Sequence, residues 1–343
     1  MSDRVLVTGV SGYLAGHIVT ELLDRGYAVR GTVRSLGHPE TTAHLPGIEL
    51  VAADLTADDG WAEAVAGCRY VVHAASPFPG SEPDHEDDLV RPAVDGTLRL
   101  LRAAEAAGVE RVVLTSSVAA VRVGHSVRCT EDDWSDPAAC NAYEKSKTLA
   151  ERAAWEFAEE RPGFEFTVVN PGMILGPVQR PEARTSVDGI RILLAREMPG
   201  VPNIGFATVD VRDLAIAHRL AMESPRAAGN RYICAGDQVS LPEMAEILAA
   251  RYRIPTRVLP NWLVRIVARF NPDAATAARY LGRREAVSSE KAVRELGWTM
   301  RPVADTLVDT AESLIRLGVV ADPGPSRRAS NGATADRRSA STS

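Results

Sequence analysis

The stretch TGVSGYLAG at residues 8–16 follows directly on the apolar run at residues 5–7. Apolar side chains then recur at helical spacing over residues 14–23, so the stretch is predicted to be a turn between a buried strand and a helix. Gly9 and Gly12 have no Cβ, which lets backbone N–H groups and the start of the helix come close to a phosphate. A glycine pattern in this strand–turn–helix context predicts a dinucleotide-binding turn.

Strand and helix signals continue to alternate along the first half of the chain. Further strands are expected at residues 29–33, 48–52, 70–74, 111–115 and 166–169, and long helices at residues 89–107 and 141–160. This alternation predicts an α/β fold, a Rossmann-type doubly wound parallel sheet with helices on both faces. Prolines interrupt the pattern from residue 177 onward, which indicates a smaller mixed C-terminal lobe.

These patterns also predict the domain organisation. We expect residues 1–177 to form the dinucleotide-binding Rossmann domain, with 207–223 as a segment that can return to it. Residues 178–321 are expected to form a substrate-binding lobe. Residues 322–343 are rich in Ser, Ala, Arg, Gly and Pro without periodicity, which predicts a disordered tail.

Composition narrows the class of protein. The chain has 343 residues, of which 45% are hydrophobic and 24% charged, as in a globular protein with a large core. A net charge of -6 gives no general attraction to nucleic acid or to an anionic membrane. No apolar run approaches the roughly 20 residues that a membrane helix needs. The four cysteines are far apart, so we expect free thiols, no metal site and a cytoplasmic location.

The end of the second strand indicates which dinucleotide binds. Enzymes that use NAD usually place an acidic residue there for the ribose 2′-hydroxyl, but residues 29–38 contain none. Arg34 instead offers a planar guanidinium that suits a 2′-phosphate, the alternative being a solvated surface arginine. We therefore expect residues 1–177 to bind NADP.

The sequence YEKSK at residues 143–147 places Tyr143 and Lys147 on one face of a helix. Reduction of a carbonyl by hydride leaves an alkoxide that needs a proton, and a free phenol has a pKa of about 10. One ammonium about 4 Å away, at an effective dielectric of about 20, supplies about 4 kcal/mol, or about 3 pKa units. Lys147 can therefore make Tyr143 a usable proton donor near neutral pH.

A pair of serines ends the fifth strand. Ser116 and Ser117 follow Thr115, at the sheet edge where ligands bind in such folds. A hydroxyl there can donate to a substrate carbonyl oxygen as negative charge develops on it. Position alone leaves both serines as candidates for this role.

Together these motifs resemble the extended short-chain dehydrogenases/reductases. The segments that carry the resemblance are TGVSGYLA at 8–15, GTVR at 31–34, TSS at 115–117, YEKSK at 143–147, VDVRDLA at 209–215 and LGW at 296–298. The chain is most similar to the branch of dihydroflavonol reductases, cinnamoyl-CoA reductases and yeast-type methylglyoxal/aldehyde reductases, over residues 3 to 317. Ala15 replaces a usual glycine, and Ala93 stands where many relatives have an asparagine.

The resemblance implies NADPH-dependent, reversible reduction of an aldehyde or ketone to an alcohol. It assigns catalysis to Ser117, rather than Ser116, together with Tyr143 and Lys147. The implied cofactor-binding residues are Gly9, Ser11, Gly12, Tyr13, Leu14, Arg34, Asp54, Leu55, Ala74, Ala75, Ser76, Tyr143, Lys147 and Pro171.

Several positions near the expected cofactor and substrate have specific expectations. Asp54 would bind the adenine amino group, with helix capping as its alternative. Pro171 would approach the nicotinamide, with a plain turn as its alternative. His73 is expected to be a packed residue at a strand end rather than a catalyst. Segments expected to line the substrate pocket supply Phe78, Met173, Asn203 and Phe206.

Two other functions are compatible with the motifs. A sugar-nucleotide epimerase or dehydratase would keep NAD tightly bound, which the Arg34 environment disfavours. A non-catalytic NADP-sensing regulator commonly lacks the tyrosine or the lysine, and both are present here. The expected partner is a small carbonyl or alcohol substrate. A homodimer through helices 89–107 and 141–160 is expected from the family resemblance.

Overall fold

The computed structural model describes residues 2–77, 83–181, 186–283 and 285–326. The chain divides into two compact units, each made of three segments. The first contains residues 1–174, 209–236 and 286–300, and the second contains residues 175–208, 237–285 and 301–343. The predicted substrate lobe, residues 178–321, includes 224–236 and 286–300, whereas in the structure both segments belong to the first unit.

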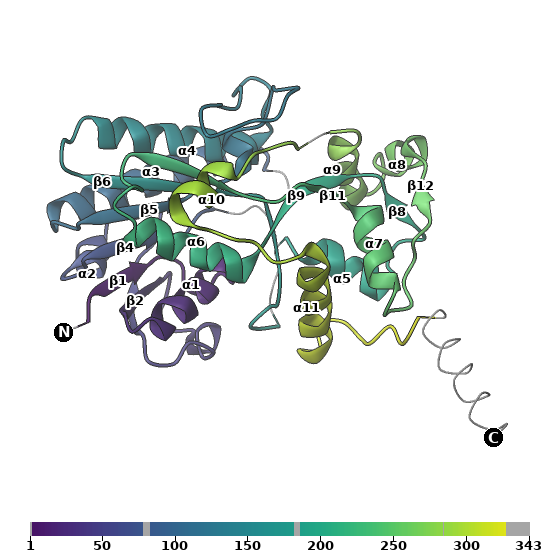
Figure 1. Cartoon of the computed structure of the whole chain (residues 1–343), viewed down its shortest axis with the longest axis horizontal. Helices are drawn as coiled ribbons and strands as arrows, with labels where there is room; N and C mark the ends of the chain where they lie inside the picture. The colour runs from purple at the N-terminus through teal and green to yellow at the C-terminus, as the bar shows by residue number, and fades with distance from the viewer. Residues whose placement is uncertain (1, 78–82, 182–185, 284, 327–343) are drawn as a thin grey trace. The chain divides into compact units, whose positions relative to one another are not determined.

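A seven-stranded parallel sheet forms the centre of the first unit (Figure 1). Its strand order is β10 (Asn230–Cys234), β6 (Glu165–Pro171), β5 (Arg111–Thr115), β4 (Tyr70–His73), β1 (Arg4–Val7), β2 (Ala28–Val33) and β3 (Glu49–Ala52). The six expected strands are present, and β10 adds a seventh beside β6. The order reverses between β1 and β4, so the carboxyl ends of these two strands flank the crevice where such folds bind nucleotides.

Alternate residues of each strand face opposite layers of helices, as the strand period of two requires. Val5 and Val7 pack with α1 (Tyr13–Asp24), α6 (Val211–Glu223) and α10 (Glu290–Leu296). Leu6 packs on the other face with α2 (Trp61–Val65), α3 (Asp87–Ala106) and α4 (Ala142–Glu159). Figure 1 shows α3 and α4 together on one side of the sheet and α1 and α6 on the other.

The start of α4 is held by a reciprocal capping box. The Asn141 side chain accepts from the Glu144 backbone N–H at 2.9 Å, and the Glu144 carboxylate accepts from the Asn141 N–H at 3.0 Å. Glu144 is buried and also pairs with Arg122 at 3.1 Å. Two N–H groups that the helix leaves unpaired are thereby satisfied, so Tyr143 lies in a well-defined first turn.

The two distal family signatures meet in the first unit. Trp298 is buried and donates from its indole N–H to the Asp213 carbonyl at 2.8 Å. Gly297 ends α10 with a φ of 65°, a left-handed conformation that glycine adopts without strain. LGW at 296–298 therefore anchors the end of α10 to α6, which is a structural role.

The second unit contains short strands and helices. Its core lies where α11 (Val303–Arg316) packs on α5 (Asp188–Ala195) and α7 (Leu241–Ala249). The remaining helices are α8 (Asn261–Val267) and α9 (Pro272–Tyr280). Residues 205–207 of β9 (Gly205–Asp210) pair antiparallel with β11 (Gln238–Ser240), and β12 (Val258–Leu259) pairs with β8 (Val201–Pro202). Along the chain, β7 (Met173–Leu175) spans the change from the first unit to the second.

Residues 322–326 belong to the folded part of the second unit. The Gly324 carbonyl accepts from the Arg253 N–H at 3.0 Å, and the Ser326 N–H donates to the Arg251 carbonyl at 3.0 Å. Ser326 is 4% exposed. The expected disordered tail is thus wrong for residues 322–326, because they bond to the chain just after α7. Residues 327–343 lie outside the described residues.

Candidate active site

The glycine turn closes tightly between β1 and α1. Gly9 has a φ of +68°, and a Cβ placed there would come 3.0 Å from the Ala75 Cβ. The Gly12 N–H donates to the Gly9 carbonyl at 2.8 Å, and α1 begins at Tyr13 with Gly12 as its N-cap. Glycine has no side chain with which to cap the helix, so the first-turn N–H groups suit an anionic ligand. The turn therefore fits a pyrophosphate.

Ala15 makes the last part of this motif a packing contact. It is 3% exposed and belongs to the core that α1 forms against β1 and β2. A methyl group fits there, so the departure from the usual glycine leaves the turn intact.

The ends of β2 and β3 bring Arg34 and Asp54 into electrostatic contact. Arg34 is exposed directly after β2. Asp54 follows β3 and accepts from the Thr56 N–H at 2.7 Å and the Thr56 hydroxyl at 2.6 Å. These hydrogen bonds lower the pKa of Asp54, and the Arg34 guanidinium lowers it further. Asp54 caps no α-helix, since α2 begins at Trp61 with Gly60 as its N-cap, so the capping alternative is excluded.

The end of β4 lies against the glycine turn. The Thr8 hydroxyl accepts from the Ala75 N–H at 2.9 Å and lies 2.8 Å from Nδ1 of His73. His73 is buried, and burial, together with the Lys147 charge, lowers its pKa to about 3. Its imidazole is therefore neutral at physiological pH and acts as a packed residue, as expected. Ala74 and Ser76 are partly buried beside it.

The two serines after β5 have different environments. The Ser116 hydroxyl donates to the buried carboxylate of Glu151. The Ser117 hydroxyl accepts from the Ala119 N–H at 3.1 Å and caps the 3₁₀ turn Val118–Ala120. An acceptor role in the cap leaves the Ser117 proton available for donation, which favours Ser117 over Ser116 as the donor to substrate.

Helix α4 carries the Tyr–Lys pair and packs against the turn that Ser117 caps. Tyr143 is partly buried, and Lys147, one turn later, is 9% exposed. Burial lowers the pKa of Lys147 to about 8, while the negative charge of Glu151 opposes the shift. Lys147 is thus mostly protonated at neutral pH, the state in which it can stabilise a phenolate.

The residues expected at the nicotinamide and substrate have mixed placements. Pro171 is buried at the end of β6, where it pairs with Cys234 of β10. Met173 is partly buried in the first unit. In the second unit Asn203 is exposed, and Phe206 packs on Tyr280 with ring centroids 5.2 Å apart. Phe78 lies outside the described residues.

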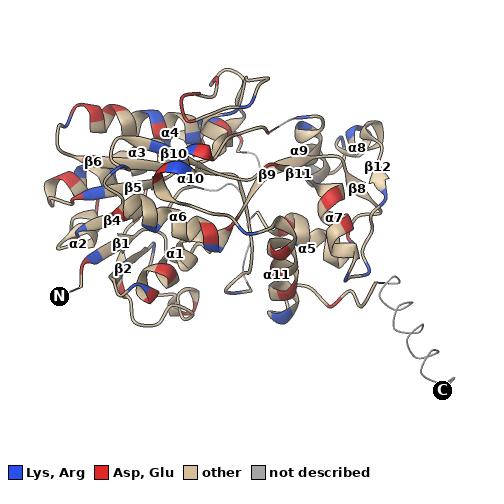
Figure 2. Ribbon diagram, viewed as in Figure 1, with Lys and Arg blue, Asp and Glu red and all other residues tan. Residues whose placement is uncertain are grey.

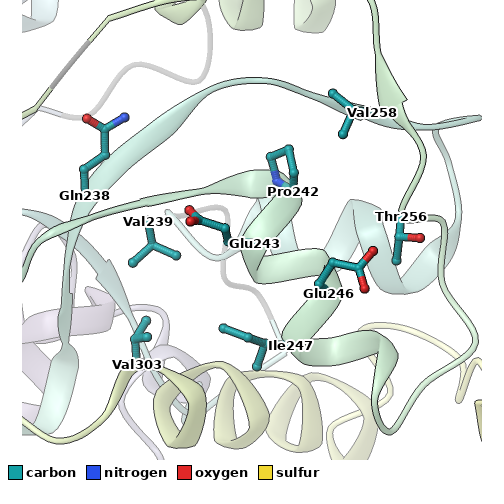
Figure 3. Close-up of a pocket in the computed structure, with 9 residues that line it drawn as sticks. All are labelled: Gln238, Val239, Pro242, Glu243, Glu246, Ile247, Thr256, Val258 and Val303. Carbon is teal, nitrogen blue, oxygen red and sulfur yellow. The ribbon is translucent and has the colours of Figure 1, made fainter.

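A separate hollow of about 590 Å³ lies within the second unit. Figure 3 shows its lining residues, which are Gln238, Val239, Pro242, Glu243, Glu246, Ile247, Thr256, Val258 and Val303. Glu243 is already engaged, because its carboxylate accepts from the N–H and the hydroxyl of Ser240, both at 2.7 Å. The residues expected to bind cofactor or substrate are not among those that line it.

Acidic and basic residues are mixed along the long helices of the first unit. Figure 2 shows that α3 and α4 each carry both acidic and basic residues, so these helices do not form a basic face for nucleic acid. Within the described residues, neither a metal-binding group of acidic, His and Cys side chains nor a helix able to cross a membrane is found.

Sequence reasoning missed one buried group at this site. Glu151, two turns after Tyr143, is 0% exposed and pairs with Arg231 of β10 at 2.6 Å. The signal available in the sequence was a glutamate four residues after Lys147, which is also common on solvated helix faces. Arg231 could not be linked to it, since β10 was not expected as a strand of this sheet.

Fold and site together define a dinucleotide-dependent oxidoreductase. The chain belongs to the NAD dependent epimerase/dehydratase family, which matches residues 5–235. Cinnamoyl-CoA reductase 1 of Petunia hybrida is 35% identical over 332 residues, covering 92% of each chain. The bifunctional dihydroflavonol 4-reductase/flavanone 4-reductase of Malus domestica is 34% identical over 278 residues, covering 75% of this chain and 79% of its own.

A solved structure agrees along almost the whole length. Yeast methylglyoxal/isovaleraldehyde reductase Gre2, complexed with NADPH, has a TM-score of 0.77 and 28% identity, covering 92% of this chain and 99% of its own. The predicted resemblance to this branch of the extended short-chain dehydrogenases/reductases and the predicted Rossmann-type fold are therefore confirmed.

Proposed function

We propose that this chain catalyses NADPH-dependent reduction of an aldehyde or ketone, with Tyr143, Lys147 and Ser117 as its catalytic residues. The oxidoreductase class and the cofactor agree with the relatives, which are reductases, one of them solved with NADPH. The residue roles are supported by one observation above all. Lys147 is a buried ammonium one helical turn from Tyr143, on a helix that packs against the Ser117 turn.

Each residue has a distinct part in the reaction. Bound NADPH supplies the hydride that adds to the carbonyl carbon. Ser117 donates a hydrogen bond to the carbonyl oxygen, and Tyr143 delivers the proton that turns this oxygen into a hydroxyl. Lys147 stabilises the resulting phenolate and holds the ribose hydroxyls. Solvent then returns a proton to Tyr143, so one carbonyl and one proton are consumed for each NADPH oxidised.

The cofactor site has a matching set of groups. The turn at Gly9 and Gly12 suits the pyrophosphate and Arg34 suits the 2′-phosphate, and we assign Asp54 to the adenine amino group. We assign the rest of the cofactor contact to Ser11, Tyr13, Leu14, Leu55, Ala74, Ala75, Ser76 and Pro171.

The decisive experiment is an NADPH-oxidation screen with aldehydes, ketones, acyl-CoA thioesters and sterols, using wild type beside Tyr143→Phe. Reduction of an aldehyde or ketone by wild type alone supports the proposal. The epimerase alternative, which the family description includes, predicts tightly held NAD and turnover of sugar nucleotides without net NADPH oxidation. The regulator alternative predicts NADPH binding without turnover.

Two further expectations belong to this proposal. A cytoplasmic location is supported by the four cysteines, which are all free thiols. Homodimer formation through α3 and α4 is proposed from the family resemblance, and the mass in solution tests it. We also propose that Met173, Phe78, Asn203 and Phe206 contribute to the substrate pocket.

A further inference from the structure

A buried carboxylate lies two helical turns after Tyr143 and has no part in the mechanism above. We propose that Glu151 is a positioning residue for proton transfer: its carboxylate sets the charge environment of the Tyr143–Lys147 pair, and its hydrogen bonds hold the Ser116–Ser117 strand end. This inference rests on the roles proposed for Tyr143 and Lys147.

The Glu151 carboxylate gathers donors from three strands of the sheet. One oxygen accepts from the Ser116 hydroxyl after β5 and, at 2.8 Å, from Nδ2 of Asn170 in β6. The other lies 2.6 Å from Nε of Arg231 in β10. Asn170 Nδ2 also donates to the Ser117 carbonyl at 3.2 Å. A chain of hydrogen bonds thus connects Glu151 to the backbone of the proposed substrate donor.

Glu151 and the catalytic pair lie along one face of α4. Tyr143, Lys147 and Glu151 are each four residues apart, so their side chains follow one another along the helix. Lys147 and Glu151 both line a small cavity of about 10 Å³, which is about the size that one water molecule needs. Two opposite charges therefore face the same small, water-poor space, where their interaction is weakly screened.

The surrounding groups determine the sign of the effect on Lys147. Arg231 is the other cation at Glu151, and Glu131 lies in turn beside Arg231. His73, from β4, is neutral near pH 7, since burial and the Lys147 charge lower its pKa to about 3. The residues of α3 that line the cavity are uncharged. Glu151 is therefore the anion that opposes the effect of burial on Lys147.

Removal of the Glu151 charge should lower the pH above which the enzyme no longer reduces its substrate. The anion favours the protonated ammonium, so without it Lys147 loses its proton at lower pH. The anion also disfavours a phenolate, so without it the Tyr143 phenol ionises at lower pH while Lys147 is still charged. Both changes move the alkaline limb of the rate profile downward, because reduction needs the phenol and the ammonium protonated. Removal of the Arg231 charge has the opposite sign. A purely structural ion pair predicts lower stability in both variants and a shift in neither.

The test measures kcat for reduction between about pH 5 and about pH 10 at saturating NADPH, with the NADPH dissociation constant and the melting temperature of each variant. Glu151→Gln should lower the alkaline midpoint by about one pH unit or more, and Arg231→Gln should raise it. Glu165→Gln is the matched control, since it neutralises a carboxylate that is paired with Arg111 at 2.5 Å at the amino end of β6, the end opposite Asn170 and Pro171. It should lower stability and keep the wild-type midpoint.

Each result decides the matter. A Glu151→Gln midpoint equal to that of wild type overturns the inference, whatever the loss of stability. If circular dichroism shows that Glu151→Gln does not fold, Arg231→Gln decides, and an unchanged or lowered midpoint overturns the inference. Failure of the proposed function is distinguishable, because Tyr143→Phe would then turn over like wild type. Failure of this inference alone leaves Tyr143→Phe inactive.

Discussion

The two units of this chain are built in different ways. In the first, a continuous parallel sheet brings the ends of β1, β4 and β5 to one edge, and each end carries its own short motif. In the second, the core joins α5, α7 and α11, which come from three separate segments of the chain. Hydride and proton transfer are proposed for the first unit and substrate choice for the second. Mutational effects should therefore be largest in the first unit and selective for substrate in the second.

The largest loss is expected from Tyr143→Phe. The change removes the transferable proton and keeps the ring, so kcat for reduction should fall by about 10³- to 10⁴-fold while NADPH binding persists. Steady-state turnover and NADPH fluorescence titration measure the two quantities. Lys147→Ala is the contrast, since it should lose turnover and also weaken NADPH binding. Substantial turnover by Tyr143→Phe would show that Tyr143 is not the proton donor.

A smaller loss is expected at the strand end of β5. Ser117→Ala removes one donor to the developing oxyanion and should lower kcat by about 10²- to 10³-fold. Ser116→Ala is the matched control, because this hydroxyl is bonded to Glu151 and should cost less than about tenfold. Measured kcat values that rank the two variants the other way would transfer the catalytic role to Ser116.

Features that depend on neighbouring residues could be predicted from the sequence, and features that depend on residues far apart in the chain could not. The glycine turn, the Ser116–Ser117 strand end and the Tyr143–Lys147 spacing each need only a few neighbouring residues and a predicted strand or helix. The Glu151–Arg231 pair joins residues 80 positions apart, and it needs β10 to pair with β6. A single sequence gives no measure of such pairing. For the same reason the place of 286–300 in the first unit was missed, since it depends on Trp298 reaching the Asp213 carbonyl.

The cofactor preference should depend on one exposed side chain. Arg34→Ala should weaken NADPH binding by about 10- to 100-fold, the loss expected for a charge-assisted contact to a phosphate. NADH binding should hardly change, because NADH has no 2′-phosphate. Fluorescence titration of both nucleotides against wild type and variant measures this difference. Equal losses for NADH and NADPH would show that Arg34 acts on the turn rather than on the 2′-phosphate.

The smallest effect is expected in the second unit, and it should fall on the substrate alone. Asn203 is exposed between β8 and β9, so Asn203→Ala should leave stability unchanged, as most surface substitutions do. If its amide contacts the substrate, its loss should raise KM by about 2- to 10-fold, the value of one neutral hydrogen bond, with kcat and NADPH affinity preserved.

Glu246→Ala is the matched control, since Glu246 is also exposed in this unit and lines the separate hollow of Figure 3. A KM change in Glu246→Ala without one in Asn203→Ala would assign substrate binding to that hollow. A kcat loss in Asn203→Ala would contradict the proposal that the second unit only selects the substrate, because this unit would then contribute to the chemical step.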